Sequence, residues 1–206
     1  MMTSLPNLLT LSRILAIPAL VASFYLREPV SNWVAMVIFV AAAVTDYFDG
    51  YLARSRGLVS NLGRFLDPVA DKLLVAAALM MLVARDRVDS WTTIPAVIIL
   101  CREIIISGLR EFLAELRVIV RVSTLAKWKT GIQMGAIGTC LVGDAGEILV
   151  PGNRVIGEGL LWIAALLTLY TGYDYLRAGL RHMMVEPPKP EAAPSGAAPV
   201  GEGAQR

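Results

Sequence analysis

The stretch that decides the fold is DYFDGYLARSRGLVSNLGRFLDPVAD, residues 46–71. It carries four aspartates in two pairs, Asp46 with Asp49 and Asp67 with Asp71. Long apolar runs flank both pairs, so these acids are expected at or near membrane depth. Ionisable side chains in such segments are costly, and their default interpretation is a functional site.

Helical spacing places each pair on one face. Positions i, i+3, i+4, i+7 and i+8 of a helix share a face, and here they are Asp46, Asp49, Gly50, Ala53 and Arg54. Two helices joined by a turn can therefore point four carboxylates into one cavity. Four neighbouring anions need cations between them, and oxygen ligands without His or Cys favour magnesium, manganese or calcium over zinc. The alternative is a set of solvated helix ends at the membrane interface.

Written as a pattern, the stretch reads D-x-x-D-G-x-x-A-R, eight residues, then G-x-x-x-D-x-x-x-D. This pattern resembles the signature of the CDP-alcohol phosphatidyltransferases, integral membrane enzymes of phospholipid synthesis. The resemblance implies that Asp46, Asp49 and Asp67 bind metal, and that Asp71 both binds metal and acts as the general base. It also implies two divalent ions, Mg²⁺ or Mn²⁺, which clamp the diphosphate of a CDP-linked lipid and stabilise the leaving phosphate.

Residues beside the aspartates are expected to hold the lipid donor, CDP-diacylglycerol. Gly50 and Ala53 have no bulky side chain, so a nucleotide can lie against the helix, and Arg54 can form a fork onto phosphate oxygens. Gly50 taken alone could equally serve helix packing. The remaining residues assigned to the donor are Ser60 in the linking loop and, in the amphipathic start of the first apolar segment, Asn7, Thr10 and Arg13.

A second substrate is expected near Arg110, Lys127 and Lys129, which can form a basic pocket for an acceptor that carries its own phosphate. They could instead be positive-inside residues that snorkel to the interface. The strings REIIISGLRE (102–111) and KWKTGIQ (127–133) are similar to the phosphatidylglycerophosphate synthase branch of the family. That branch transfers the phosphatidyl group to sn-glycerol 3-phosphate and releases CMP.

Two other functions compete with this interpretation. Another member of the same family would use a different acceptor, such as inositol phosphate, serine or phosphatidylglycerol. A cation transporter would use the acids as an ion pathway, but it favours acids on several helices and symmetry between its halves. Here the four aspartates cluster on two adjacent helices.

The chain as a whole has the composition of a helical membrane protein. Of its 206 residues, 56% are apolar, and the mean hydropathy is +0.61. A net charge of +2 is too small and scattered to indicate nucleic acid. No strand-like alternation competes, so we expect an all-α bundle of six transmembrane helices of about 20 residues each. The six apolar segments fall near 8–26, 32–54, 67–84, 92–115, 125–144 and 155–180.

Charge asymmetry predicts how this bundle lies in the membrane. Four arginines lie on one side and eleven basic residues on the other, which predicts that the second side, with both termini and the aspartates, is cytoplasmic. We therefore expect a multi-pass protein of a bacterial inner (plasma) membrane. Residues 1–185 form one membrane domain, and 186–206, rich in Pro, Ala and Gly, form a disordered tail. Gly131 and Gly135 make a G-x-x-x-G for close helix packing or for a homodimer contact.

Overall fold

The computed structural model describes residues 5–56, 61–116 and 124–184. It describes the backbone alone at 5–10, 46–56, 61–65, 124, 126–127 and 181–184. The described ranges contain no strand. They form α1 (Leu5–Ser23), α2 (Val30–Arg56), α3 (Asn61–Ala84), α4 (Thr93–Glu115), α5 (Thr124–Val142) and α6 (Asn153–Met184), with the short 3₁₀ turns η1 (Ser90–Thr92) and η2 (Gly143–Gly146).

These helices confirm the all-α prediction, and each expected apolar segment is a helix. The predicted tail, 186–206, lies outside the described residues.

The start of the third helix was predicted wrongly. We expected it near residue 67, but α3 begins at Asn61 and contains Pro68 in its interior. Proline removes one backbone hydrogen bond, here to the carbonyl of Arg64. Helices of membrane proteins tolerate this loss because neighbouring groups can satisfy the freed carbonyl.

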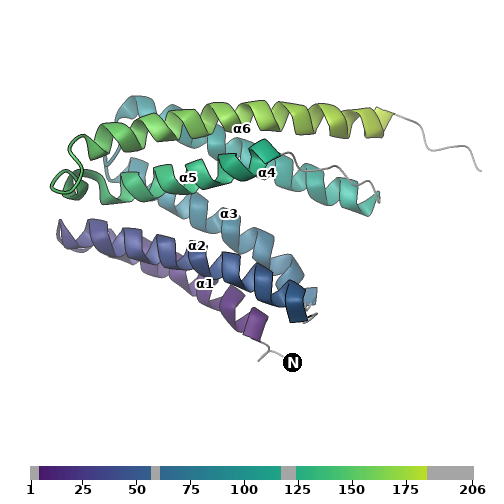
Figure 1. Cartoon of the computed structure of the whole chain (residues 1–206), viewed down its shortest axis with the longest axis horizontal. Coiled ribbons are helices and arrows are strands. Elements are labelled where there is room, and N and C mark those ends of the chain that lie inside the picture. The colour runs from purple at the N-terminus through teal and green to yellow at the C-terminus, as the bar shows by residue number, and fades with distance from the viewer. Residues whose placement is uncertain (1–4, 57–60, 117–123, 185–206) are drawn as a thin grey trace, which may run out of the picture.

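The helices run up and down and form two groups of three (Figure 1). In one group α1 packs on α2 and α3, and in the other α6 packs on α4 and α5. Contacts of α2 with α5 and of α3 with α4 and α5 join the groups. Figure 1 shows the two groups close together at one end and diverging toward the other. We call the diverging end, where α2 ends and α3 begins, the wide end. The opposite end, with the connections 24–29, 85–92 and 143–152, is the loop end.

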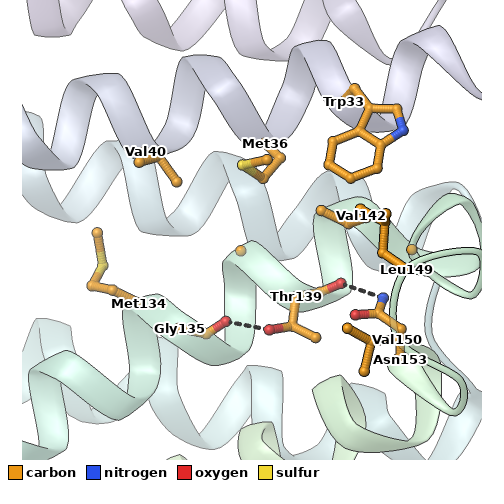
Figure 2. A pocket seen from close by; sticks show the side chains of 12 residues that line it. Trp33, Met36, Val40, Met134, Gly135, Thr139, Val142, Leu149, Val150 and Asn153 are labelled. Carbon is orange, nitrogen blue, oxygen red and sulfur yellow. Dashed lines mark hydrogen bonds between the residues drawn. The ribbon is translucent and has the colours of Figure 1, made fainter.

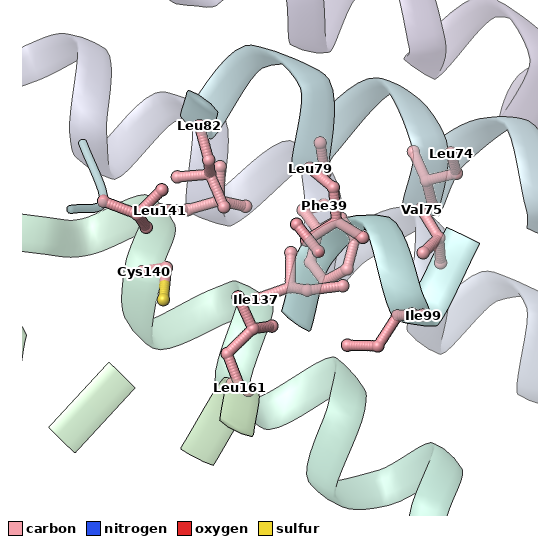
Figure 3. Close-up of a cluster of buried hydrophobic side chains, with 14 of the residues drawn as sticks. Phe39, Leu74, Val75, Leu79, Leu82, Ile99, Ile137, Cys140, Leu141 and Leu161 are labelled. Atoms are coloured by element: carbon pink, nitrogen blue, oxygen red, sulfur yellow. The ribbon is translucent and has the colours of Figure 1, made fainter. Parts of the chain in front are cut away.

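The core lies around α3 (Figure 3). From α3 it takes Leu74, Leu79 and Leu82, each with 1% of its surface exposed. The other helices contribute buried apolar side chains that pack against them, including Phe39 of α2, Ile99 of α4, Ile137 and Leu141 of α5 and Leu161 of α6. Because helices in a bilayer gain little from hiding apolar surface from lipid, close packing of this kind is what holds them together.

The outward faces of the helices are apolar as well. Val37 of α2, Ile104 of α4 and Leu166 of α6 are 57%, 68% and 62% exposed. A water-soluble monomer rarely presents so much apolar surface, whereas a bilayer requires it. In the described part of the chain, two helical stretches are long and apolar enough to cross a membrane, Ser90–Glu115 and Asn153–Leu180. Shorter apolar helices cover Leu11–Ser23 and Val30–Thr45. The protein is thus membrane-associated, and the count of six crossings stays a prediction.

Polar side chains lock the two groups together at the loop end. Asn32 donates from Nδ2 to the carbonyl of Val142 at 2.9 Å, linking α2 to α5. Arg87 donates from Nη2 to the Ser31 hydroxyl at 2.6 Å and from Nη1 to the Leu141 carbonyl at 3.2 Å. These bonds tie the connection after α3 to both groups, while the wide end remains splayed.

Candidate active site

The hairpin of α2 and α3 brings the two aspartate pairs to the same end of the molecule. Asp46 and Asp49 lie in the second half of α2, and Asp67 and Asp71 lie in the first half of α3. Only residues 57–60 separate the two antiparallel helices. The backbones of the two pairs therefore share the wide end.

The described side chains of this set are accessible. Asp67 is exposed, and the side chain of Asp71 is 40% exposed one turn further along α3. The side chains of Asp46 and Asp49 lie outside the described ones. Among the side chains described, no three His, Cys, Asp or Glu residues come together as a metal site. The convergence of four carboxylates stays a prediction. The ligand atoms that these residues offer are carboxylate oxygens, without nitrogen or sulfur, and such oxygens fit a hard divalent cation.

The residues predicted to hold the donor are only partly described. Gly50, Ala53 and Arg54 lie in α2 beside the aspartates with backbone positions alone, and Ser60 lies outside the described residues. Asn7 and Thr10, also defined by backbone alone, lie in the first turns of α1, which packs on α2 and α3. The side chain of Arg13, one turn later, is buried, with 1% exposed.

The basic residues predicted for the acceptor lie on the other group of helices. Arg110 is exposed on α4, with its guanidinium carbon 5.9 Å from the ring centroid of Tyr175 on α6. Lys129 of α5 is buried, and its side chain is only 5% exposed. The side chain of Lys127 lies outside the described ones. The structure thus separates an accessible Arg110 from an enclosed Lys129.

Lys129 is enclosed because its ammonium is paired with Glu103 of α4. One oxygen of Glu103, Oε1, accepts from Lys129 Nζ and lies 3.4 Å from Arg102 Nη1. The other, Oε2, lies 2.8 Å from Lys72 Nζ of α3. Three cations therefore surround one carboxylate that is 10% exposed. A buried charge needs such partners to offset its lost hydration.

Two further contacts extend this network. Lys72 Nζ also lies 3.1 Å from Oδ2 of Asp71, so one ammonium bridges Glu103 and the predicted general base. Arg102 donates from Nη2 to the Thr171 hydroxyl of α6 at 3.1 Å. Gly172 makes room for that arginine, because a Cβ there would lie 3.1 Å from Arg102 Cγ. The network thus joins α3, α4, α5 and α6.

Sequence reasoning missed the roles of Lys72 and Glu103. Arg102 and Glu103 are neighbours in the sequence and are in contact, but Lys72 and Lys129 approach Glu103 more closely. One signal was available, since Lys72 directly follows the last aspartate of the pattern. A lysine at that position in an apolar segment requires a partner, although the sequence alone does not say which.

Described residues line two apolar cavities elsewhere, and no carboxylate lines either. One, of about 330 Å³, lies between α2 and the end of α5, where Trp33, Met36 and Met134 surround it (Figure 2). Two of its polar side chains are already bonded, since Thr139 donates to the Gly135 carbonyl and Asn153 to the Thr139 carbonyl. The other, of about 400 Å³, lies between α4 and α6. Neither cavity offers the chemistry that the aspartates do.

Comparison with known proteins identifies the family. A family model described as "CDP-alcohol phosphatidyltransferase" matches residues 3–170, which include all four aspartates. The chain belongs to this family, and the predicted resemblance is confirmed.

Curated relatives point to one branch. A protein of Rickettsia bellii is 47% identical, over 85% of this chain and 94% of its own. One of Pectobacterium atrosepticum is 46% identical, over 91% and 100%. A third, of Cereibacter sphaeroides, is 37% identical, over 89% and 98%. All three are named CDP-diacylglycerol–glycerol-3-phosphate 3-phosphatidyltransferase.

Proposed function

We propose that this protein transfers the phosphatidyl group of CDP-diacylglycerol to sn-glycerol 3-phosphate, giving phosphatidylglycerophosphate and CMP. The observation that carries the proposal is the α2–α3 hairpin, which places the complete aspartate pattern at one end of the molecule. The basic ends of α4 and α5 lie at the same end. Relatives with this activity in their names are similar over nearly their full length, which supports the choice of acceptor.

Asp46, Asp49, Asp67 and Asp71 are the residues that would hold two divalent cations, Mg²⁺ or Mn²⁺. Asp67 and Asp71 are accessible and lie one turn apart, so both carboxylates can bind a cation that enters from solvent. When bound, the cations would neutralise the diphosphate and the phosphate of the leaving CMP.

The donor is assigned to the first group of helices. Gly50 and Ala53 let the nucleotide lie against α2, and Arg54 and Ser60 bind its phosphates. Asn7, Thr10 and Arg13 are assigned to the donor from α1, which contacts both aspartate helices. The acyl chains stay in the membrane beside the apolar outer faces of the bundle.

The acceptor is assigned to the facing group, with Arg110 and Lys127 on its phosphate. Lys129 does not bind this phosphate directly, because its ammonium is already paired with Glu103 and enclosed. Its role is to hold Glu103 in place. Asp71 takes the proton of the attacking hydroxyl as the new oxygen–phosphorus bond forms and the bond to CMP breaks. General-base help of this kind typically contributes about 10²–10⁴ in rate.

The membrane arrangement completes the proposal. All six helices cross the bilayer of a bacterial inner membrane, and the wide end faces the cytoplasm, where the excess of Lys and Arg lies. The chain acts as a homodimer. In support, a Cβ at Gly131 or Gly135 would meet no described atom of the same chain within 4 Å, which leaves this G-x-x-x-G open to a second copy.

An acceptor panel tests the function. Purified protein is given CDP-diacylglycerol, magnesium and labelled glycerol 3-phosphate, inositol phosphate, serine or phosphatidylglycerol, and CMP release and the labelled lipid are measured. We expect turnover with glycerol 3-phosphate alone. Preference for another acceptor would refute the choice of glycerol 3-phosphate and keep the family reaction. If none of the four acceptors led to CMP release, the transfer itself would be refuted.

A further inference from the structure

We propose that Lys72 binds a phosphate oxygen of a substrate at the transfer site, and that Glu103 is the residue that positions it. The inference rests on the proposed transfer reaction, and it adds a residue outside the aspartate pattern and outside the predicted basic pocket. The phosphate belongs either to the diphosphate of the donor or to the acceptor, and the experiment below distinguishes these sources.

Exposure singles out Lys72 among the cations around Glu103. The side chains of Lys129 and Arg102 are 5% and 13% exposed, so their charged groups serve the interior of the bundle. The side chain of Lys72 is 32% exposed. Of these three cations, Lys72 is therefore the one that a ligand at the wide end can reach.

The position of the Lys72 ammonium suits a phosphate ligand. An ammonium carries three N–H donors. One is directed at Glu103 Oε2, at 2.8 Å, and a second at Asp71 Oδ2, at 3.1 Å. Among the described residues nothing else accepts from Lys72, so a third donor is available beside the aspartate that is proposed to activate the acceptor. A charge-assisted bond from an ammonium to a phosphate oxygen is among the stronger hydrogen bonds.

Glu103 keeps this ammonium in place because it is itself held from three sides. Lys129 of α5 and Arg102 contact its other oxygen, and Arg102 is tied to Thr171 of α6. A flexible lysine that is fixed by two carboxylates loses less conformational freedom when a ligand binds. The network would therefore preorganise Lys72 from the group of helices that faces α3.

The competing explanation is a structural one, in which the Lys72–Glu103 pair only joins α3 to α4. The two explanations differ in what a substitution changes. A purely structural pair affects stability and affects both substrates alike. A phosphate-binding lysine changes the Michaelis constant of one substrate, and its effect depends on the charge at position 72.

The test compares Lys72→Gln, Lys72→Arg and wild type, with Arg27→Gln, an exposed cation at the loop end, as the matched control. Michaelis constants for both substrates, equilibrium binding of CDP-diacylglycerol and thermal stability in detergent are measured on each. We expect Lys72→Gln to raise the Michaelis constant of one substrate about tenfold or more and that of the other less than about twofold. Lys72→Arg should recover part of that loss, and Arg27→Gln should match wild type.

The substrate affected identifies the phosphate. A loss confined to CDP-diacylglycerol, seen also in direct binding, assigns Lys72 to the donor diphosphate, and a loss confined to the acceptor assigns it to the acceptor phosphate. Glu103→Gln should raise the same Michaelis constant, and this effect should add little in the Lys72→Gln background because the two act as a unit. It should also lower thermal stability, because it leaves the enclosed Lys129 and Arg102 without their carboxylate.

Unchanged constants in Lys72→Gln, or equal losses for both substrates with lowered thermal stability, would overturn the inference. Either result leaves the proposed function standing if the wild type still transfers to glycerol 3-phosphate. If the wild type does not, the proposed function fails. The role of Lys72 is then still decided by its effect on CDP-diacylglycerol binding and on the Michaelis constant of whichever acceptor the wild type uses.

Discussion

Arg110→Ala is the substitution that separates acceptor binding from stability. Arg110 is exposed, and the contact that the structure gives it is the ring of Tyr175 at 5.9 Å. An exposed contact of this type contributes about 0.5–1 kcal/mol, so the fold should lose no more than that. Lys129 does not allow the same experiment, because its removal would disturb the buried carboxylate of Glu103.

The expected kinetic effect is larger than the stability effect. If Arg110 binds the acceptor phosphate, its loss removes a charge-assisted hydrogen bond worth about 1.5–3 kcal/mol. That corresponds to a roughly tenfold to hundredfold increase in the Michaelis constant for glycerol 3-phosphate. The constant for CDP-diacylglycerol should change little, since the donor is assigned to α1 and α2.

Initial rates of CMP release, with each substrate varied at saturation of the other, measure both constants. Glu111→Ala changes the exposed neighbour on α4 and serves as the control for a loss of surface charge. Equal effects on the two substrates, or no effect on either, would refute the acceptor role and leave Arg110 as a residue that sets membrane topology.

Three further outcomes are expected. Chelation should abolish transfer, and magnesium or manganese should restore it, because diphosphate and carboxylates repel each other without a cation; full activity after exhaustive metal removal would contradict this. In a cysteine-free background, a cysteine at Ser60 should react with reagents from the cytoplasm and one at Arg27 from outside, and the reverse pattern would overturn the orientation. At the loop end, the backbone N–H groups of Arg154 and Gly152 donate to Glu147 at 3.1 and 2.7 Å and lower the pKa of its carboxyl below the usual 4.5. The order that this carboxylate gives the loop should persist above about pH 4.5 and be lost as the pH falls through the lowered pKa. Protection of both amides against hydrogen exchange, measured relative to the intrinsic rate at each pH, should then fall in wild type but not in Glu147→Gln.

Much of the fold could be predicted because a membrane helix is a local pattern. An apolar run of about 20 residues and the helical spacing of Asp67 and Asp71 need no knowledge of distant contacts. Helix ends are less certain from sequence, and Pro68 shows why. A proline usually indicates a helix start, but here α3 extends about two turns before it.

The site could be predicted only where its residues follow one another at fixed spacing. The pairing of Glu103 with Lys72 and Lys129 depends on how α3, α4 and α5 pack, which no local pattern encodes. That packing also decides which lysine is enclosed and which is accessible. In the sequence Lys129 looks like a free cation, but it is buried against Glu103. Lys72 is therefore the more accessible lysine beside Glu103.

The most direct test of the account compares Asp71→Asn with Asp46→Asn across a magnesium titration, measuring turnover and CDP-diacylglycerol binding in each. Asn keeps the size and one oxygen of the aspartate but cannot accept the proton at neutral pH. We expect Asp71→Asn to lose about 10²–10⁴ in turnover at every magnesium concentration and to keep part of its donor binding, whereas Asp46→Asn should lose metal and donor binding together. If excess magnesium returns Asp71→Asn to near full turnover, Asp71 acts as a ligand alone and the general base lies elsewhere.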